Sequence, residues 1–137
     1  MKAISLWQPW ASAMALGWKR NETRSWATSY RGPLLIHAAK KAIGWPSIYI
    51  QSLFDGIAFQ PTDLPRGCLL CMVNLVDCKR ILLHNRPRGV EFELGTYTPG
   101  RFMWITEQLE IFDPIPFRGS QRIFEVPDLI KIPNKRR

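Results

Sequence analysis

Acidic residues are scarce in the first part of this 137-residue sequence, where Glu22 is the only Asp or Glu before Asp55. The same stretch contains seven lysines and arginines, so residues 1–54 contribute +6 of the formal net charge of +8. Such a basic chain favours partners rich in phosphate, because lysine and arginine displace the counterions condensed on a nucleic acid. The charge therefore indicates a polyanionic partner.

Long apolar runs are also missing, since no segment approaches the roughly 20 residues that a membrane-spanning helix needs. The beginning of the sequence does not follow the pattern of a signal peptide, because Gln8 and Pro9 interrupt the short apolar segment after Lys2. We therefore expect an intracellular, cytoplasmic protein that has no membrane partner.

Cysteine is rare as well, with three residues in the sequence. Cys68, Cys71 and Cys78 are an odd number in one apolar stretch, which is unlike a disulfide framework. Together with His84 they match a zinc site of three cysteines and one histidine by composition. In a strand, however, residues 68 and 71 point to opposite faces of the sheet. We therefore predict reduced thiols, no metal and no cofactor.

The length and the hydrophobic content of 46% are those of one globular domain with a single core, over residues 1–137. Hydrophobic patterns and turn residues predict strands over residues 2–6, 22–26, 34–38, 68–83, 101–112 and 123–126, and helices over 9–16 and 45–59. Residues 85–100 have the glycine and proline content of an exposed, mobile loop. We expect residues 135–137 to be a basic, solvated end.

These elements predict an α+β fold, a small barrel of five or six strands with two or three flanking helices. Closure of the barrel would leave no open strand edge.

The segment Gly17-x-Lys19-x-x-Glu22-x-Arg24 carries the most informative chemistry. Strand alternation places Glu22 and Arg24 on one face with Trp26, and Thr23 and Ser25 on the other. A turn after Gly17 brings Lys19 within reach of that face. Lysine and arginine could then grip a phosphate while the carboxylate accepts from an exocyclic amine such as that of cytosine. A purely structural ion pair remains the alternative.

Aromatic residues are interleaved with these cations. Trp7, Trp10 and Trp26 offer flat faces for base stacking, although a tryptophan can equally fill the core. His37 lies in the most apolar predicted strand, where a structural role is expected.

The sequence resembles the ASCH domain, a branch of the PUA-like superfamily of small RNA-associated β-barrels. The resemblance rests on residues 5–11, the motif from Gly17 to Arg24, residues 25–26 and 30–32, residues 35–38, residues 64–67 with 73–77, and residues 114–116 with Gly119. It implies a PUA-like β-barrel with a cleft between the barrel and the first helix, lined by the motif.

The resemblance makes Lys19, Glu22 and Arg24 candidate catalytic groups. The predicted nucleic-acid-binding residues are Trp7, Gln8, Pro9, Trp10, Lys19, Glu22, Arg24, Ser25, Trp26 and Arg31. We expect alanine at Lys19 or Glu22 to remove ligand binding and to leave the fold intact.

Two functions are compatible with this cleft. The first is a module that binds single-stranded RNA or one nucleotide-like ligand, including a modified nucleobase. The second is a small hydrolase, either a ribonuclease or a nucleoside amidohydrolase. Members similar to the amidohydrolases have a threonine nucleophile where this chain has Glu22. Metal-dependent phosphodiester cleavage would need several carboxylates, and the motif contains only Glu22. Glu91 and Glu93 are the only evident further candidates for this role. These residues favour RNA or nucleotide binding over hydrolysis. A third possible function is docking of an acidic protein partner on the basic face.

Overall fold

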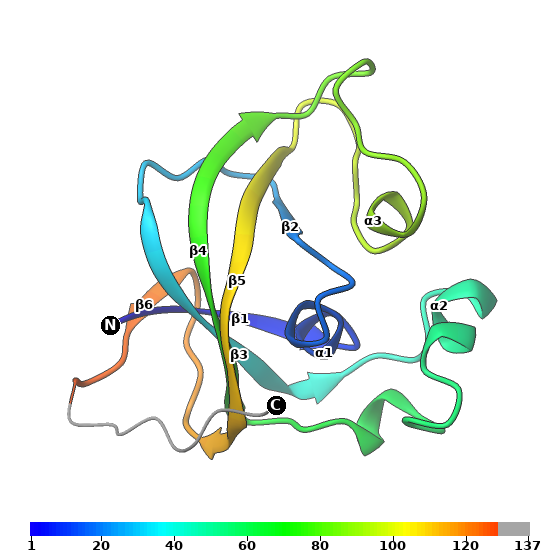
Figure 1. Ribbon diagram of the computed structural model, residues 1–137, viewed down its shortest axis with the longest axis vertical. Coiled ribbons are helices and arrows are strands. Elements are labelled where there is room, and N and C mark those ends of the chain that lie inside the picture. Colours follow the sequence, from blue (N-terminus) through cyan, green and yellow to red (C-terminus); the bar gives the residue numbers. More distant parts are fainter. Residues whose placement is uncertain (129–137) are drawn as a thin grey trace.

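Six strands and three short helices make up residues 1–128, the part of the chain that this computed structural model describes (Figure 1). The strands are β1 (Lys2–Gln8), β2 (Asn21–Arg24), β3 (Gly32–Ala42), β4 (Cys68–Arg80), β5 (Phe102–Pro116) and β6 (Ile123–Glu125). The helices are α1 (Trp10–Ala15), α2 (Ile48–Leu53) and α3 (Val90–Glu93), with a 3-10 turn, η1 (Pro61–Asp63). The predicted basic end at residues 135–137 lies outside the described residues.

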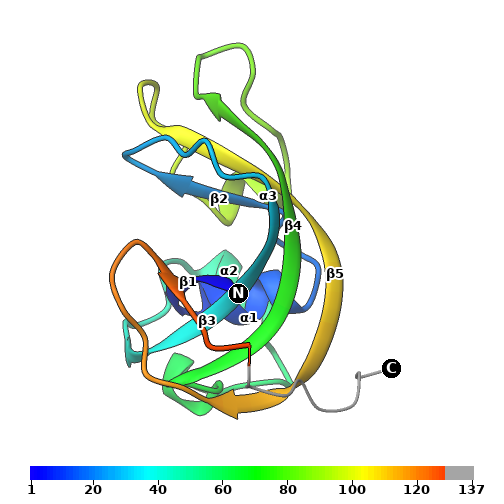
Figure 2. The same ribbon diagram turned by 90° about the vertical axis from the view of Figure 1, so that its left-hand side faces the viewer.

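The strands form one mixed sheet in the order β2-β5-β4-β3-β1-β6. Only β1 and β3 run parallel, and every other neighbouring pair is antiparallel. Long strands β4 and β5 arch around the side of the molecule that carries β1, β2 and α1 (Figure 2). The predicted α+β class, with six strands and three flanking helices, is confirmed.

Strand pairing does not close this sheet into a barrel, so the prediction of a sheet without open edges needs correction. Strand β6 pairs with β1 only along Lys2–Ile4, and β2 pairs with β5 alone. From Ser5 onward the outer edge of β1 therefore has no strand beside it in the described chain. One side chain crosses from β2 to this edge, because Arg24 Nη2 donates to the Ser5 carbonyl at 3.0 Å.

The main core fills the space between the curved sheet and α1. Trp104 of β5 is fully buried there against Ala11 and Met14 of α1 and the apolar residues of β1, β3 and β4. Helix α2 adds a second cluster in which Ile50 and Phe54 pack with Leu94. The core thus fixes α1 beside β1. Among the described residues, no helix is long and apolar enough to span a membrane.

Two predicted boundaries differ for identifiable reasons. The predicted helix over 45–59 is limited to Ile48–Leu53, where Ser47 Oγ accepts from Ile50 N as an N-cap. Strand β5 continues through Pro114 to Pro116, beyond the predicted end at 112. This is possible because β2 pairs only with Phe102–Ile105, so the second half of β5 is an edge where a missing N–H is tolerated.

Candidate nucleic-acid-binding cleft

A cleft of about 290 Å³ opens where the sheet is not closed, between β1 and β2. It is lined by Ser5, Leu6, Trp7, Trp10, Lys19, Glu22, Thr23, Arg24, Leu94, Gly95, Thr96 and Arg101. The volume is near the lower end of the range for small-molecule sites. Three cations and one carboxylate are in this lining, which gives the cleft a net charge of +2.

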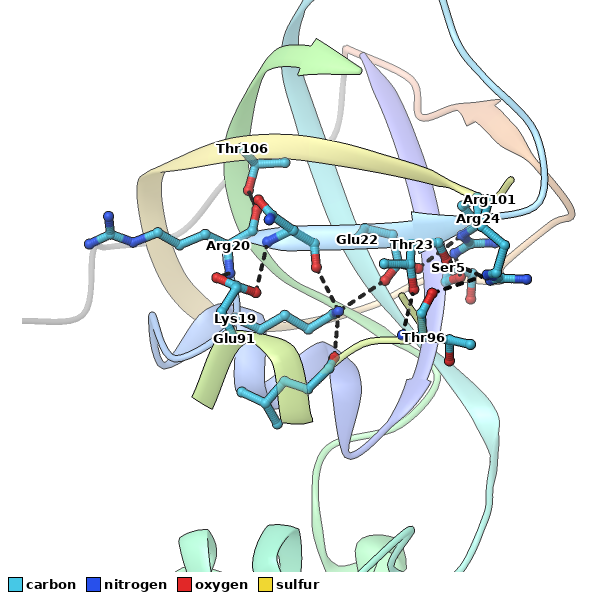
Figure 3. A network of polar contacts seen from close by, with 12 residues as sticks. Ser5, Lys19, Arg20, Glu22, Thr23, Arg24, Glu91, Thr96, Arg101 and Thr106 are labelled. Carbon is cyan, nitrogen blue, oxygen red and sulfur yellow. Dashed lines mark hydrogen bonds and ion pairs between the residues drawn. The ribbon is translucent and has the colours of Figure 1, made fainter. Parts of the chain in front are cut away.

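Lys19 forms the base of the cleft and is almost completely buried, with 2% of its side chain exposed. Its Nζ donates to the carbonyls of Asn21 at 2.6 Å and Leu94 at 2.7 Å (Figure 3). Glu22 Oε1 lies 3.4 Å from the same nitrogen. An ammonium has three protons, so these contacts account for all of them. Lys19 therefore joins β2, through Asn21 and Glu22, to Leu94 at the base of the cleft.

Glu22 links Lys19 to the rim of the cleft. Its second oxygen, Oε2, accepts from Arg24 Nε at 2.9 Å, and its side chain is 13% exposed. The two contacts leave lone pairs on the carboxylate, which can accept from about four donors. Arg24 is 24% exposed and uses Nε and Nη2 for Glu22 and Ser5, so donors of its guanidinium remain for a ligand.

The far wall of the cleft is the segment from α3 to β5. Thr96 N donates to Thr23 Oγ1 at 3.0 Å, and Arg101 Nη2 donates to the Thr23 carbonyl at 3.2 Å. Glu91 accepts from the backbone N–H groups of Arg20 and Asn21 at 2.8 and 3.2 Å. These bonds cover the free edge of β2, as exposed strand edges require (Figure 3).

This wall corrects the prediction of an exposed, mobile loop at 85–100. The segment contains α3, and Leu94 and Tyr97 are buried. Sequence reasoning did not place Leu94, Gly95, Thr96 and Arg101 in this cleft, because their partners Lys19 and Thr23 lie about 75 residues away in the chain. Leu94 and Tyr97, which flank Gly95 and Thr96, were the only sequence signal for this packing.

Gly95 is required where the wall passes Tyr97. A Cβ added at Gly95 would lie 2.6 Å from Tyr97 Cε2 and 3.3 Å from Thr23 Cγ2. We expect Gly95→Ala to lower the free energy of unfolding by about 1–3 kcal/mol, because a buried ring must move. Chemical denaturation of Gly95→Ala beside Gly44→Ala measures this, since a Cβ at Gly44 meets nothing within 4 Å. Equal stability of the two variants would contradict the assigned contact.

The predicted binding residues separate into two groups. Trp7, Trp10, Lys19, Glu22 and Arg24 line the cleft together. Trp7 is 45% exposed at the rim, with Lys41 Nζ 5.1 Å from its ring centre. The ring centre of Trp10 lies 5.8 Å from Lys19 Nζ, and Trp10 also packs against the main core.

The remaining predicted residues lie outside the cleft. Gln8 is fully buried, and its amide bonds Ser12 and the Pro65 carbonyl, next to buried Pro9. The ring of Trp26 contacts Trp104 and the guanidinium of Arg122. Two exposed residues complete this group, Ser25 just after β2 and Arg31 in the turn before β3. Thr23, which alternation assigned to the other face, does line the cleft.

The cysteines do not gather into a metal site in the described part of the chain. No three Cys, His, Asp or Glu side chains come together there as ligands. Cys68 and Cys71 are buried free thiols, and burial raises the pKa of Cys71 to about 12. Such thiols stay protonated near neutral pH and make poor nucleophiles.

His37 joins three segments beneath the outer edge of β1. Its Nε2 lies 2.7 Å from the Phe117 carbonyl and its Nδ1 2.9 Å from Ser5 Oγ. Burial of the ring lowers the pKa of His37, and the hydrogen bond with the Phe117 carbonyl raises it by a smaller amount. In the neutral ring Nε2 donates to that carbonyl, so Nδ1 accepts from the Ser5 hydroxyl. This bonding fits the structural role expected for His37.

This buried ring predicts a loss of stability in acid. The unfolded chain binds a proton at His37 at a higher pH than the folded chain does, so the free energy of unfolding falls as pH drops below about 6.5. Above that pH the group makes no pH-dependent contribution. Urea unfolding at pH 7.5 and 5.5 measures the difference, which should shrink in His37→Gln and persist in the exposed control His84→Gln. An undiminished difference in His37→Gln would assign the effect to other groups.

Comparison with known proteins decides the family of this chain. The model of the ASCH domain matches residues 4–115, which include most of β1, all of β2 to β4, nearly all of β5 and every residue that lines the cleft. The chain belongs to the ASCH domain family. ASCH domains are a family of PUA-like RNA-binding modules. Lys19, Glu22 and Arg24 of the sequence motif line the cleft of this ASCH domain.

Two relatives with curated names match this ASCH domain. Activating signal cointegrator 1 from Homo sapiens is 33% identical over 135 residues, and the protein of that name from Mus musculus is 31% identical over 135 residues. Each alignment covers 93% of this chain and 22% of the relative. This ASCH domain therefore spans about a fifth of the length of the relatives it matches.

Proposed function

We propose that the protein binds single-stranded RNA and takes one unstacked base into the cleft between β1 and β2. The observation that carries this proposal is the combination of Glu22, partly exposed and held in place by Lys19 and Arg24, with an exposed tryptophan at the same rim. Trp7 supplies a face for stacking. Glu22 accepts from the amine of the base, and Arg24 and Arg101 give the cleft its excess positive charge.

Binding is favoured over hydrolysis by the bonding of Lys19. A lysine acting as a general base must have a free lone pair within reach of a substrate. The ammonium of Lys19 instead has two backbone carbonyls and Glu22 as partners, and only 2% of its side chain is exposed. The carboxylate of Glu91, the other candidate for hydrolysis, accepts hydrogen bonds from the backbone N–H groups of Arg20 and Asn21 at the start of β2. These contacts support a positioning role for both residues.

A salt titration tests the proposal. We expect the affinity for a fluorescent single-stranded 12-mer RNA to fall steeply with salt, with a slope of about −0.7 in log–log form for each neutralised phosphate. Arg24→Ala should weaken binding and make the slope shallower by about one contact. Arg80→Ala is the matched control, because Arg80 is an exposed cation that lies over Phe102, outside the cleft.

Thermal melting must accompany this titration because Arg24 also bridges β2 and β1. The proposal is wrong if the affinity does not change with salt. It is also wrong if a folded Arg24→Ala protein binds as the Arg80→Ala control does.

A further inference from the structure

A second cavity, which we call the β3 groove, shares Ser5 of β1 with the cleft. It has a volume of about 870 Å³ and is lined by residues 116–121 and by residues 37, 39 and 40 of β3. Ser5, His37, Lys40 and Arg118 line it, together with the polar side chains of Ser120 and Gln121. The volume would accommodate a ligand larger than the base-sized cleft can take.

Two glycines shape this groove. A Cβ on Gly119 would lie 2.6 Å from His37 Cε1, so only glycine lets residues 117–121 lie directly over the buried ring. Gly67 has a φ of +67°, and a Cβ there would meet Cγ of Lys40 at 3.1 Å. The stem of Lys40 therefore passes over Gly67 along the groove. The close approaches hold the two sides of the groove at a fixed separation.

The groove is cationic. Its lining contains Lys40 and Arg118 and no acidic residue. Both side chains are exposed, and neither forms an ion pair with any residue in the range 1–128. Uncompensated cations beside hydroxyl and amide groups suit a phosphate and a sugar.

Ser5 belongs to both cavities. On the cleft side its carbonyl accepts from Arg24 Nη2 at 3.0 Å, and on the groove side its hydroxyl lies 2.9 Å from His37 Nδ1. Arg24 lines the cleft and Lys40 lines the groove, and Ser5 borders both cavities. A ligand that fills the cleft can continue across β1 at Ser5 without leaving the cationic surface.

We propose that the β3 groove is a second nucleotide subsite, which holds the sugar, phosphate and base adjoining the nucleotide in the cleft. The inference rests on the proposed function of the cleft. The strand crosses β1 at Ser5, and Lys40 and Arg118 bind its phosphate backbone. The shortest ligand that uses the whole site is then a dinucleotide.

The test compares cytidine with the dinucleotide CpC in NMR titrations of the ¹⁵N-labelled protein. Cytidine should shift the amide signals of Thr23, Gly95 and Thr96 in the cleft. CpC should also shift those of Gly119, Ser120 and Gln121, and should bind at least tenfold more tightly. The double variant Lys40→Ala/Arg118→Ala should lose most of this gain and bind cytidine as the unchanged protein does. Lys79→Ala/Arg80→Ala is the control with the same loss of charge outside both cavities.

The outcomes separate the two proposals. If cytidine shifts the cleft signals but CpC binds no more tightly, the groove is not a subsite and the cleft remains a binding site. The groove is also not a subsite if the Lys40→Ala/Arg118→Ala variant still binds CpC more tightly than cytidine by the same factor. It is likewise excluded if the Lys79→Ala/Arg80→Ala control loses as much of this CpC affinity as the groove variant does. If neither ligand shifts the cleft signals, the proposed function fails and the groove proposal fails with it.

Discussion

Lys19→Met is expected to lower the free energy of unfolding by about 3–5 kcal/mol, because it removes one partner from a buried charged network. The change leaves the carbonyls of Asn21 and Leu94 and one oxygen of Glu22 without the ammonium that they share. Methionine keeps most of the volume, so the effect comes from polar groups rather than from a cavity. Urea unfolding at pH 7 gives the size of the loss.

Lys79→Met is the control for Lys19→Met. Lys79 is 56% exposed, and its Nζ lies 3.9 Å from Asp77, so its replacement should change stability by less than about 0.5 kcal/mol. Similar stability of the two variants would mean that Lys19 does not hold β2 and the α3–β5 segment together. The account of the cleft floor would then be wrong.

Glu22→Gln is expected to reduce a preference for amine-bearing bases. A charged carboxylate accepts a stronger hydrogen bond from the cytosine amine than an amide does, and uracil offers no such amine. We expect the unchanged protein to bind oligocytidylate about tenfold more tightly than oligouridylate, the lower part of the range for one good base contact. In Glu22→Gln the ratio should fall to about twofold.

Glu107→Gln is the matched control, because Glu107 is exposed on β5 and does not line the cleft. It makes the same change of charge and should keep the preference for oligocytidylate. Equal affinity of the unchanged protein for both oligonucleotides would reject Glu22 as a base-reading group. A preference that survives in Glu22→Gln would do the same.

The sequence predicted the sheet well where local patterns determine it. The apolar run at Leu34–Ala38 and the long apolar segment from Cys68 both lie in central strands, and Gly17 ends α1 with a positive φ of 82°. The open edge of β1 was not predictable in this way. It depends on how many residues β6 pairs with and on the contact between Arg24 and Ser5, which are tertiary features.

The site was predicted in part for the same reason. Spacing alone brought Lys19, Glu22 and Arg24 together correctly, but it gave no information on burial. Lys19 was therefore expected to be dispensable for folding, whereas its contact with Leu94 requires the segment before β5 to pack on β2. Trp26 was expected to stack on a base, but its ring forms a T-shaped contact with Trp104 and lies beneath the guanidinium of Arg122.

A crystal structure of the protein with a short single-stranded RNA that contains cytidine tests the central claim most directly. The account predicts one unstacked base in the cleft between β1 and β2, with its amine on Glu22, its face near Trp7 and a phosphate near Arg24. RNA bound at another surface, such as the basic loop that carries Arg86 and Arg88, with no base in the cleft, would contradict it.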